Sequence, residues 1–257
     1  MPSILLVPDR FADYRMWSDI PDRIQARAQV VHFDRHEQVP WTAADGGFLT
    51  TARRLAPDGT FDIVAGAGQA ARFAFAVAEA GLARGVVFFY PSLDRVLDEA
   101  VSSMADIDLT EVLGPYVPIV GAMQEGDASG RRDVLLRVVR DTAGPDAESG
   151  ELERMEGMII DHAEGFFAHL RATVHAAAAA GPARPAPPWL ERPWIDRLAD
   201  LPIPVMAVVA PRNRAIGDAI ASRAADAEII LASPRMAPVA EPGRSAGILV
   251  RMLDRLG

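Results

Sequence analysis

Polar side chains follow five of the strands that the sequence predicts, at the points where those strands end. The set comprises Asp9, Arg10, Gln69, Ser92, Asp94, Arg212, Asn213 and Arg235. Because ligands gather outside the carboxyl ends of strands in open α/β sheets, we expect these residues to border a site. We assign a catalytic role to Gln69, Arg10 and Asp94, and a substrate-binding role to the other five. Arg212 could clamp a carboxylate or a phenolate, or lie on the surface.

Histidine is the next residue type that could do chemistry, and the chain holds five histidines. His32 and His36 lie in or just after a predicted strand, so we expect neither at the chemistry. His162 and His169 lie on one face of a predicted helix. That face either packs against protein or presents His162 as a general base. No histidine pair has a carboxylate at a suitable spacing, so we expect no metal site.

Aromatic residues and methionines near the predicted strand ends form a third group. Together with Gly68, the members to which we assign substrate binding are Phe11, Trp17, Tyr90, Tyr116, Met155, Met158, Phe166, Trp189 and Met236. Such side chains favour a flat, apolar ligand. At helical spacing they also serve packing, so the group mixes ligand contacts with core residues.

Short apolar runs alternate with helical patterns along most of the chain. The predicted strands are residues 4–7, 30–33, 61–65, 86–90, 205–210 and 228–231. The predicted helices between and after them are residues 12–28, 46–55, 69–81, 216–225 and 245–256. This alternation predicts an α/β fold with about six mostly parallel strands flanked by helices.

Residues 93–201 interrupt the alternation with helical patterns only. We interpret them as an inserted helical cap that ends in a Pro-rich connector at residues 181–188. Residues 1–92 and 202–257 then form the core domain. A cap helix lies across the site in this arrangement, which is why His162 is our candidate base.

The composition excludes several classes of function. Half of the 257 residues are hydrophobic, which allows a large core, and a net charge of −9 opposes binding to nucleic acid. No apolar run approaches the roughly 20 residues that span a bilayer, so we expect a cytoplasmic protein with no membrane partner. Cysteine and lysine are both absent, which excludes disulfides, thiolate sites and a lysine Schiff base. Abundant arginine and alanine indicate a GC-rich, actinobacterial genome.

The order of elements resembles the capped branch of the α/β-hydrolase superfamily over nearly the whole chain. In that family a nucleophile stands in G-x-S-x-G between a strand and a helix. The corresponding segment reads Gly66-Ala67-Gly68-Gln69-Ala70, which puts Gly68 in the nucleophile's place. The acid's place reads Pro211-Arg212-Asn213-Arg214, and the histidine's place reads Arg235-Met236-Ala237-Pro238. The resemblance therefore implies an α/β-hydrolase fold from which the Ser-His-Asp triad is lost. Some hydrolases of this fold relocate their acid to the position of Asp94.

The resemblance leaves two backbone donors at the expected site. The first donor is the N–H of Gln69, at the N-terminus of a predicted helix. The second is the N–H of Arg10 in the first loop, which reads Pro8-Asp9-Arg10 where the family has H-G-x. Together they could hold an oxyanion. Such a site suits a substrate that carries its own reactive electrons, as a phenolate or an enolate does.

Related folds host cofactor-independent oxygenases, lyases and cyclases, which implies chemistry without a cofactor. In the oxygenase case an aromatic anion gives an electron directly to dioxygen. We therefore expect cofactor-free oxygenation of a bulky, apolar, polyketide-like aromatic metabolite, as in antibiotic biosynthesis.

Several alternatives stay open. The same pocket could serve a cyclase or lyase, a non-catalytic protein that only binds its ligand, or a hydrolase in which Asp9 or Asp94 activates water. A dinucleotide cofactor is disfavoured, because Gly66 and Gly68 lack the third glycine of G-x-G-x-x-G. A homodimer is compatible with the sequence, which contains nothing that decides the assembly.

Overall fold

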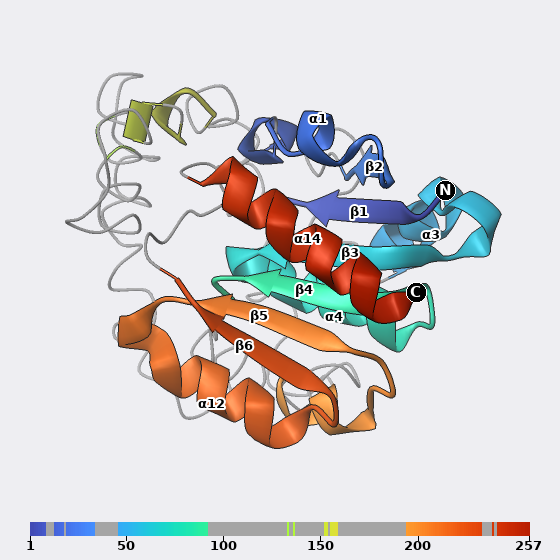
Figure 1. Ribbon diagram of the computed structural model, residues 1–257, viewed down its shortest axis with the longest axis vertical. Coiled ribbons are helices and arrows are strands. Elements are labelled where there is room, and N and C mark those ends of the chain that lie inside the picture. The colour runs from blue at the N-terminus through green and yellow to red at the C-terminus, as the bar shows by residue number, and fades with distance from the viewer. Residues whose placement is uncertain are drawn as a thin grey trace, which may run out of the picture.

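The computed structural model of the chain describes residues 1–8, 13–17, 19–33, 46–91, 133, 136, 152–153, 155–158, 194–232, 238 and 241–257. Within these residues, six strands form one parallel sheet in the order β2-β1-β3-β4-β5-β6 (Figure 1). The strands are β1 (Ser3–Val7), β2 (Gln29–His32), β3 (Phe61–Ala67), β4 (Ala83–Phe89), β5 (Val205–Val209) and β6 (Ala227–Leu231). The predicted six-stranded parallel sheet is confirmed.

The burial of the strands explains their sequences. Every residue of β1 and β5 is buried, and both read as continuous apolar runs, apart from Ser3. Strands covered on both faces need such runs. The edge strands β2 and β6 are more exposed and carry polar residues such as Gln29 and Glu228.

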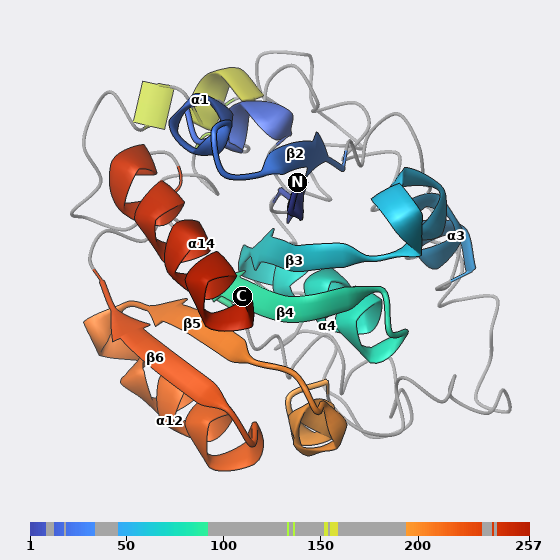
Figure 2. The same cartoon turned by 45° about the vertical axis from the view of Figure 1, so that its right-hand side comes forward.

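Helices cover both faces of the sheet. On one face lie α1 (Pro21–Ile24) and α14 (Pro242–Leu256), and on the other lie α3 (Gly46–Leu55), α4 (Ala71–Glu79) and α12 (Arg214–Arg223). Figure 2 shows α14 in front of β3 and β4, with α4 behind them. Alternate strand residues serve the two faces: Leu6 packs in the core under α14, and Leu5 packs in the core under α4.

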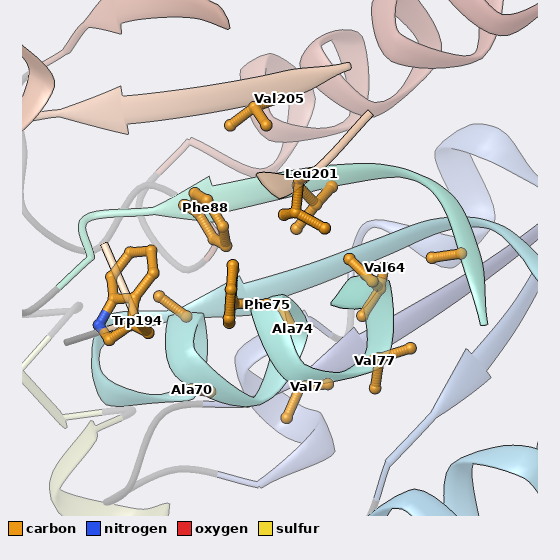
Figure 3. Close-up of a cluster of buried hydrophobic side chains, with 14 of the residues drawn as sticks. Val7, Val64, Ala70, Ala74, Phe75, Val77, Phe88, Trp194, Leu201 and Val205 are labelled. Atoms are coloured by element: carbon orange, nitrogen blue, oxygen red, sulfur yellow. The ribbon is translucent and has the colours of Figure 1, made fainter. Parts of the chain in front are cut away.

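The core on the α4 face includes a residue from the end of the predicted cap. Trp194 is buried there, with its ring centroid 5.1 Å from that of Phe88 and 5.8 Å from that of Phe75 (Figure 3). This contact anchors the 3₁₀ helix η5 (Asp196–Asp200), after which the chain enters β5. Within the predicted cap, residues 133, 136, 152–153 and 155–158 are helical, and residues 194–200 form a turn followed by η5. The division into core and cap stays a prediction.

The predicted helix over residues 12–28 is wrong as a continuous element. The segment contains the 3₁₀ helix η1 (Tyr14–Trp17) and the short helix α1, which begins at Pro21. Proline has no N–H to donate and clashes with the carbonyl four residues earlier, so a helix cannot run through it. The N–H of Ile20 donates to the carbonyl of Trp17 at 2.9 Å, which closes the first piece before the second starts.

Strands β3 and β4 are longer than the apolar runs that predicted them. Gly66 and Ala67 resemble a turn by residue type, yet they pair in register with Phe88 and Phe89. The turn therefore begins at Gly68, and α4 begins at Ala71. None of the described helices is long and apolar enough to cross a membrane.

Candidate functional site

A tight turn follows β3 at the carboxyl edge of the sheet. Gly68 has φ 55°, and the 3₁₀ turn η3 (Gly68–Ala70) leads directly into α4. The N–H of Ala71 donates to the carbonyl of Gly68, which closes the turn. An L-residue in this left-handed region would cost about 1–2 kcal/mol, whereas glycine adopts it freely.

Small residues on both sides of Gly68 let the helix lie directly against the strand. A Cβ atom on Gly66 would lie 2.5 Å from the carbonyl oxygen of Ala70 and 3.0 Å from the Cβ of Ala74. Ala70 itself is fully buried. The segment from Gly66 to Ala70 is therefore a strand-turn-helix unit. Its residues have to be small because the backbone of the strand and that of the helix lie so close together.

Gln69 is the second residue of this turn. Its side chain lies outside the described residues, but its backbone is in η3 at the amino end that leads into α4. N–H groups in the first turn of a helix have no partner within the helix, and the helix dipole makes this end positive. The role of Gln69 as an oxyanion donor stays a prediction.

Tyr90 lies beside Gly68 at the end of the next strand. Ala67 and Phe89 are register partners, so Gly68 and Tyr90 directly follow a paired position. Tyr90 has φ 50°, its N–H donates to the carbonyl of Val208 at 2.8 Å, and its hydroxyl donates to the carbonyl of Ala232 at 3.3 Å. Two left-handed residues thus stand side by side at the ends of β3 and β4.

Three of the predicted lining residues are buried together on the α14 side of this edge. Trp17 has no exposed surface, and its ring lies edge-on to Phe89 with centroids 5.5 Å apart. Met155 and Met158 belong to the same hydrophobic cluster and are 5% and 2% exposed. Within the described part of the chain, the indole N–H of Trp17 has no hydrogen-bond partner. Their packing role is clear, and their contact with a ligand stays a prediction.

The segment after β5 forms the 3₁₀ turn η6 (Pro211–Asn213), followed by α12. Asn213 is half-buried, and its N–H donates to the carbonyl of Ala210 at 2.8 Å. The side chain of Arg214 is exposed and lies 3.9 Å from Asp218 one helical turn away. The side chain of Arg212 lies outside the described residues.

Comparisons with known proteins bear on the fold. No protein-family model and no curated protein matches the sequence. Solved structures do match: a hydrolase from Oleispira antarctica has a TM-score of 0.67 at 12% identity, over 99% of this chain and 91% of its own. A thermophilic esterase from Thermogutta terrifontis has a TM-score of 0.65 at 15% identity, over 100% and 90% of the two chains. The enol-lactonase from Burkholderia xenovorans has a TM-score of 0.64 at 15% identity, over 98% and 91%.

The chain has the α/β-hydrolase fold. Sequence identities this low establish the fold alone. The chemistry of this α/β-hydrolase-fold chain has to be argued from its own residues.

Eleven of the predicted site residues lie outside the described part of this α/β-hydrolase fold. They are Asp9, Arg10, Phe11, Ser92, Asp94, Tyr116, His162, Phe166, Trp189, Arg235 and Met236. Their roles stay predictions. Of the predicted set, the structure brings together Gly68, Gln69 and Tyr90 on neighbouring strands, with Trp17 packed against Phe89 below them.

Sequence reasoning missed a polar group close to Trp17. The carboxylate of Asp13 is buried and accepts hydrogen bonds from the backbone N–H of Arg15 at 2.8 Å and from its guanidinium at 2.7 and 2.9 Å. This ion pair anchors η1, which carries Trp17. An aspartate just before a helical turn, bonded to the N–H two residues later, is a local pattern that the sequence does display.

His32 at the end of β2 behaves as a strand residue, as its position suggested. Burial lowers the pKa of His32 below its usual value. Its ring centroid lies 6.2 Å from that of Tyr14, and its buried Nδ1 has no hydrogen-bond partner among the described residues. Within those residues, no group of three or more His, Cys, Asp or Glu side chains could hold a metal ion.

Proposed function

We propose that this protein is a cofactor-free enzyme that tailors a bulky, apolar aromatic metabolite by stabilising its anion, with oxygenation as the reaction. The observation that carries the proposal is Gly68, at φ 55° in the turn between β3 and α4. In the α/β-hydrolase fold this strained turn presents the nucleophile. Glycine offers no side chain with which to form an acyl or alkyl intermediate.

What remains at the turn is the backbone itself. Gln69 belongs to η3, which leads into the amino end of α4. Its N–H and the positive end of that helix would stabilise negative charge on a ligand. One well-placed donor of this kind is worth roughly 3 kcal/mol in a transition state. A substrate that ionises to a phenolate or an enolate uses such donors without any nucleophile from the protein.

The apolar side of the same edge supports an aromatic ligand. Trp17, Phe89, Met155 and Met158 are buried in one cluster on the α14 face of the sheet. A site that borders them would exclude water, and exclusion of water strengthens every electrostatic interaction within it. In the oxygenase reaction the ligand anion supplies the electrons and dioxygen is the co-substrate. The protein then has to deprotonate, orient and shield the ligand.

A hydrolase without a covalent intermediate is the second candidate. The observation in its favour is the fold comparison, in which the matching structures include a hydrolase, an esterase and an enol-lactonase. In this chain a carboxylate, Asp9 or Asp94, would have to activate water directly. Such a mechanism needs no nucleophilic side chain at the turn, so it is also consistent with glycine at position 68.

Isotope labelling separates the candidates. Metal-stripped protein is incubated with a panel of hydroxyanthraquinones and related polyketides, some of which carry an ester or lactone. The incubations run in air and without oxygen, with labelled dioxygen or labelled water in parallel, and the products are analysed by mass spectrometry. We expect product only in air, with oxygen atoms from labelled dioxygen. Label from water would establish a hydrolase, conversion without oxygen a cyclase or lyase, and a ligand recovered bound but unchanged a binding protein.

A further inference from the structure

Tyr90 has a backbone conformation that its residue type does not explain. Among the described residues, Asp58 and Tyr90 are the non-glycine residues with positive φ. Aspartate enters the left-handed region readily, whereas a bulky side chain there is an outlier that costs about 1–3 kcal/mol. Such strain persists only where surrounding contacts impose it, and it concentrates at functional sites.

The conformation has a visible consequence for the side chain. In β4 the side chains alternate, so that Phe88 packs on the α4 face (Figure 3) and Phe89 packs on the α14 face. A continuing strand would send Tyr90 back to the α4 face. Instead Tyr90 packs against the same cluster as Phe89. The left-handed turn therefore keeps the phenol ring on the side where Trp17, Met155 and Met158 lie.

The hydroxyl of Tyr90 reaches across the end of β5 to the end of β6. Its partner there is the carbonyl of Ala232, the residue that directly follows β6. The backbone N–H of Tyr90 meanwhile stays bonded to Val208 of β5. Strand pairing fixes the main chain, and the turn fixes where the phenol lies.

The bond to Ala232 is long for a hydroxyl. Its length of 3.3 Å exceeds the usual range of about 2.5–3.0 Å for an O–H donor and an oxygen acceptor. A hydrogen bond to an anionic oxygen is shorter and about twice as strong as one to a neutral carbonyl. A ligand anion that reaches the hydroxyl would therefore replace the carbonyl of Ala232 as the acceptor of this hydrogen bond.

We propose that Tyr90 is a ligand-binding donor whose phenol O–H hydrogen-bonds an anionic oxygen of the substrate, on the side of Gly68 where β5 and β6 end. This inference rests on the proposed function and deepens it. It gives the site two points of recognition: the backbone at the β3 turn, and a hydroxyl held over β5 and β6. The substrate class that fits is an aromatic compound with two separate polar groups: one that binds at the turn of Gly68, and an ionised oxygen that binds the hydroxyl of Tyr90.

The test uses alizarin, a hydroxyanthraquinone whose visible spectrum reports its ionisation. Its affinity for the whole protein is measured across pH in the wild type, in Tyr90→Phe and in Tyr14→Phe. Tyr90→Phe removes the hydroxyl and keeps the packed ring. Tyr14 is half-exposed on η1 and is the matched control for loss of a phenol hydroxyl. Thermal melting confirms that both variants are folded.

We expect Tyr90→Phe to weaken binding of the alizarin anion about tenfold and to raise the pKa of the bound dye accordingly. Binding of the neutral dye and the behaviour of Tyr14→Phe should match the wild type. Equal loss for both forms of the dye, or no loss, would overturn the role of the hydroxyl and leave the proposed function standing. A wild-type protein that binds neither alizarin nor any other ionisable aromatic of the substrate panel would overturn the proposed function and this inference with it.

Discussion

Asp58 and Tyr90 share a left-handed backbone at opposite edges of the sheet. Asp58 lies at the amino edge, in the exposed 3₁₀ turn η2 (Pro57–Gly59) before β3, and Gly59 after it is also left-handed. Tyr90 lies at the carboxyl edge, between hydrogen bonds to Val208 and Ala232. The first conformation follows from local residue types, because Pro-Asp-Gly is a turn sequence. The second is imposed by the fold.

The two edges also differ in how they are held together. At the amino edge, Asp62 accepts a hydrogen bond from the N–H of Ser3 and pairs with Arg84, each at 2.8 Å. Arg84 in turn donates to the carbonyl of Leu256 at the end of α14. These contacts join β1, β3, β4 and the C-terminal helix. The amino edge is thus held by charged contacts between strands, while the carboxyl edge has left-handed residues, Gly68 and Tyr90, at the ends of two neighbouring strands.

Replacing Gln69 by proline tests most directly whether the carboxyl edge has the proposed functional role. The change removes the N–H that we propose as an anion donor, so the rate on a converted hydroxyanthraquinone should fall about 10²-fold or more. Gln69→Ala keeps the N–H and should keep the rate. Steady-state kinetics on both variants provide the measurement. An unchanged rate in Gln69→Pro would remove the oxyanion proposal.

Gly66→Ala tests how tightly the turn at the carboxyl edge is built. The new Cβ would lie 2.5 Å from the carbonyl oxygen of Ala70, so strand and helix must separate. We expect the free energy of unfolding to fall by about 2–3 kcal/mol in chemical denaturation. Gly247→Ala, exposed on α14 with nothing within 4 Å of its new Cβ, is the control and should stabilise slightly. Equal stability of both variants would contradict the close approach.

Gly68→Ser restores a hydroxyl at the β3 turn. The left-handed φ should cost about 1–2 kcal/mol of stability. We expect no hydrolysis of para-nitrophenyl acetate, because the sequence resemblance aligns Met236 with the histidine that would take the serine proton, and methionine has no proton to relay. Efficient ester turnover by this variant would show that a base exists at the site and that our alignment of the triad positions is wrong.

Asp58 offers the smallest effect and sharpens the contrast with Tyr90. Asp58→Gly should change the free energy of unfolding by less than about 0.5 kcal/mol, since glycine also adopts the left-handed region without strain. Asp58→Ala should cost about 1 kcal/mol, because alanine lacks the side chain that supports the left-handed region. Thermal and chemical denaturation measure both. A large loss in Asp58→Gly would indicate a tertiary role for this turn.

Much of the fold could be predicted from residue types. The apolar runs of β1 and β5 are buried on both faces, and such strands are recognised without knowledge of their neighbours. The break at Pro21 was also readable, because proline ends a helix for covalent reasons. The last residues of β3 were not, since Gly66 and Ala67 become strand only through pairing with Phe88 and Phe89.

The site divides in the same way. The sequence by itself determined that the nucleophile's position holds Gly68 and so has no nucleophilic side chain, because residue type does not depend on folding. It also determined that no thiol and no lysine is present anywhere in the chain. Only the tertiary structure decided that Tyr90 is left-handed, that its ring shares a face with Phe89, and that its hydroxyl meets Ala232. Those features depend on strands far apart in sequence, and no local pattern encodes a contact between residues 90 and 232.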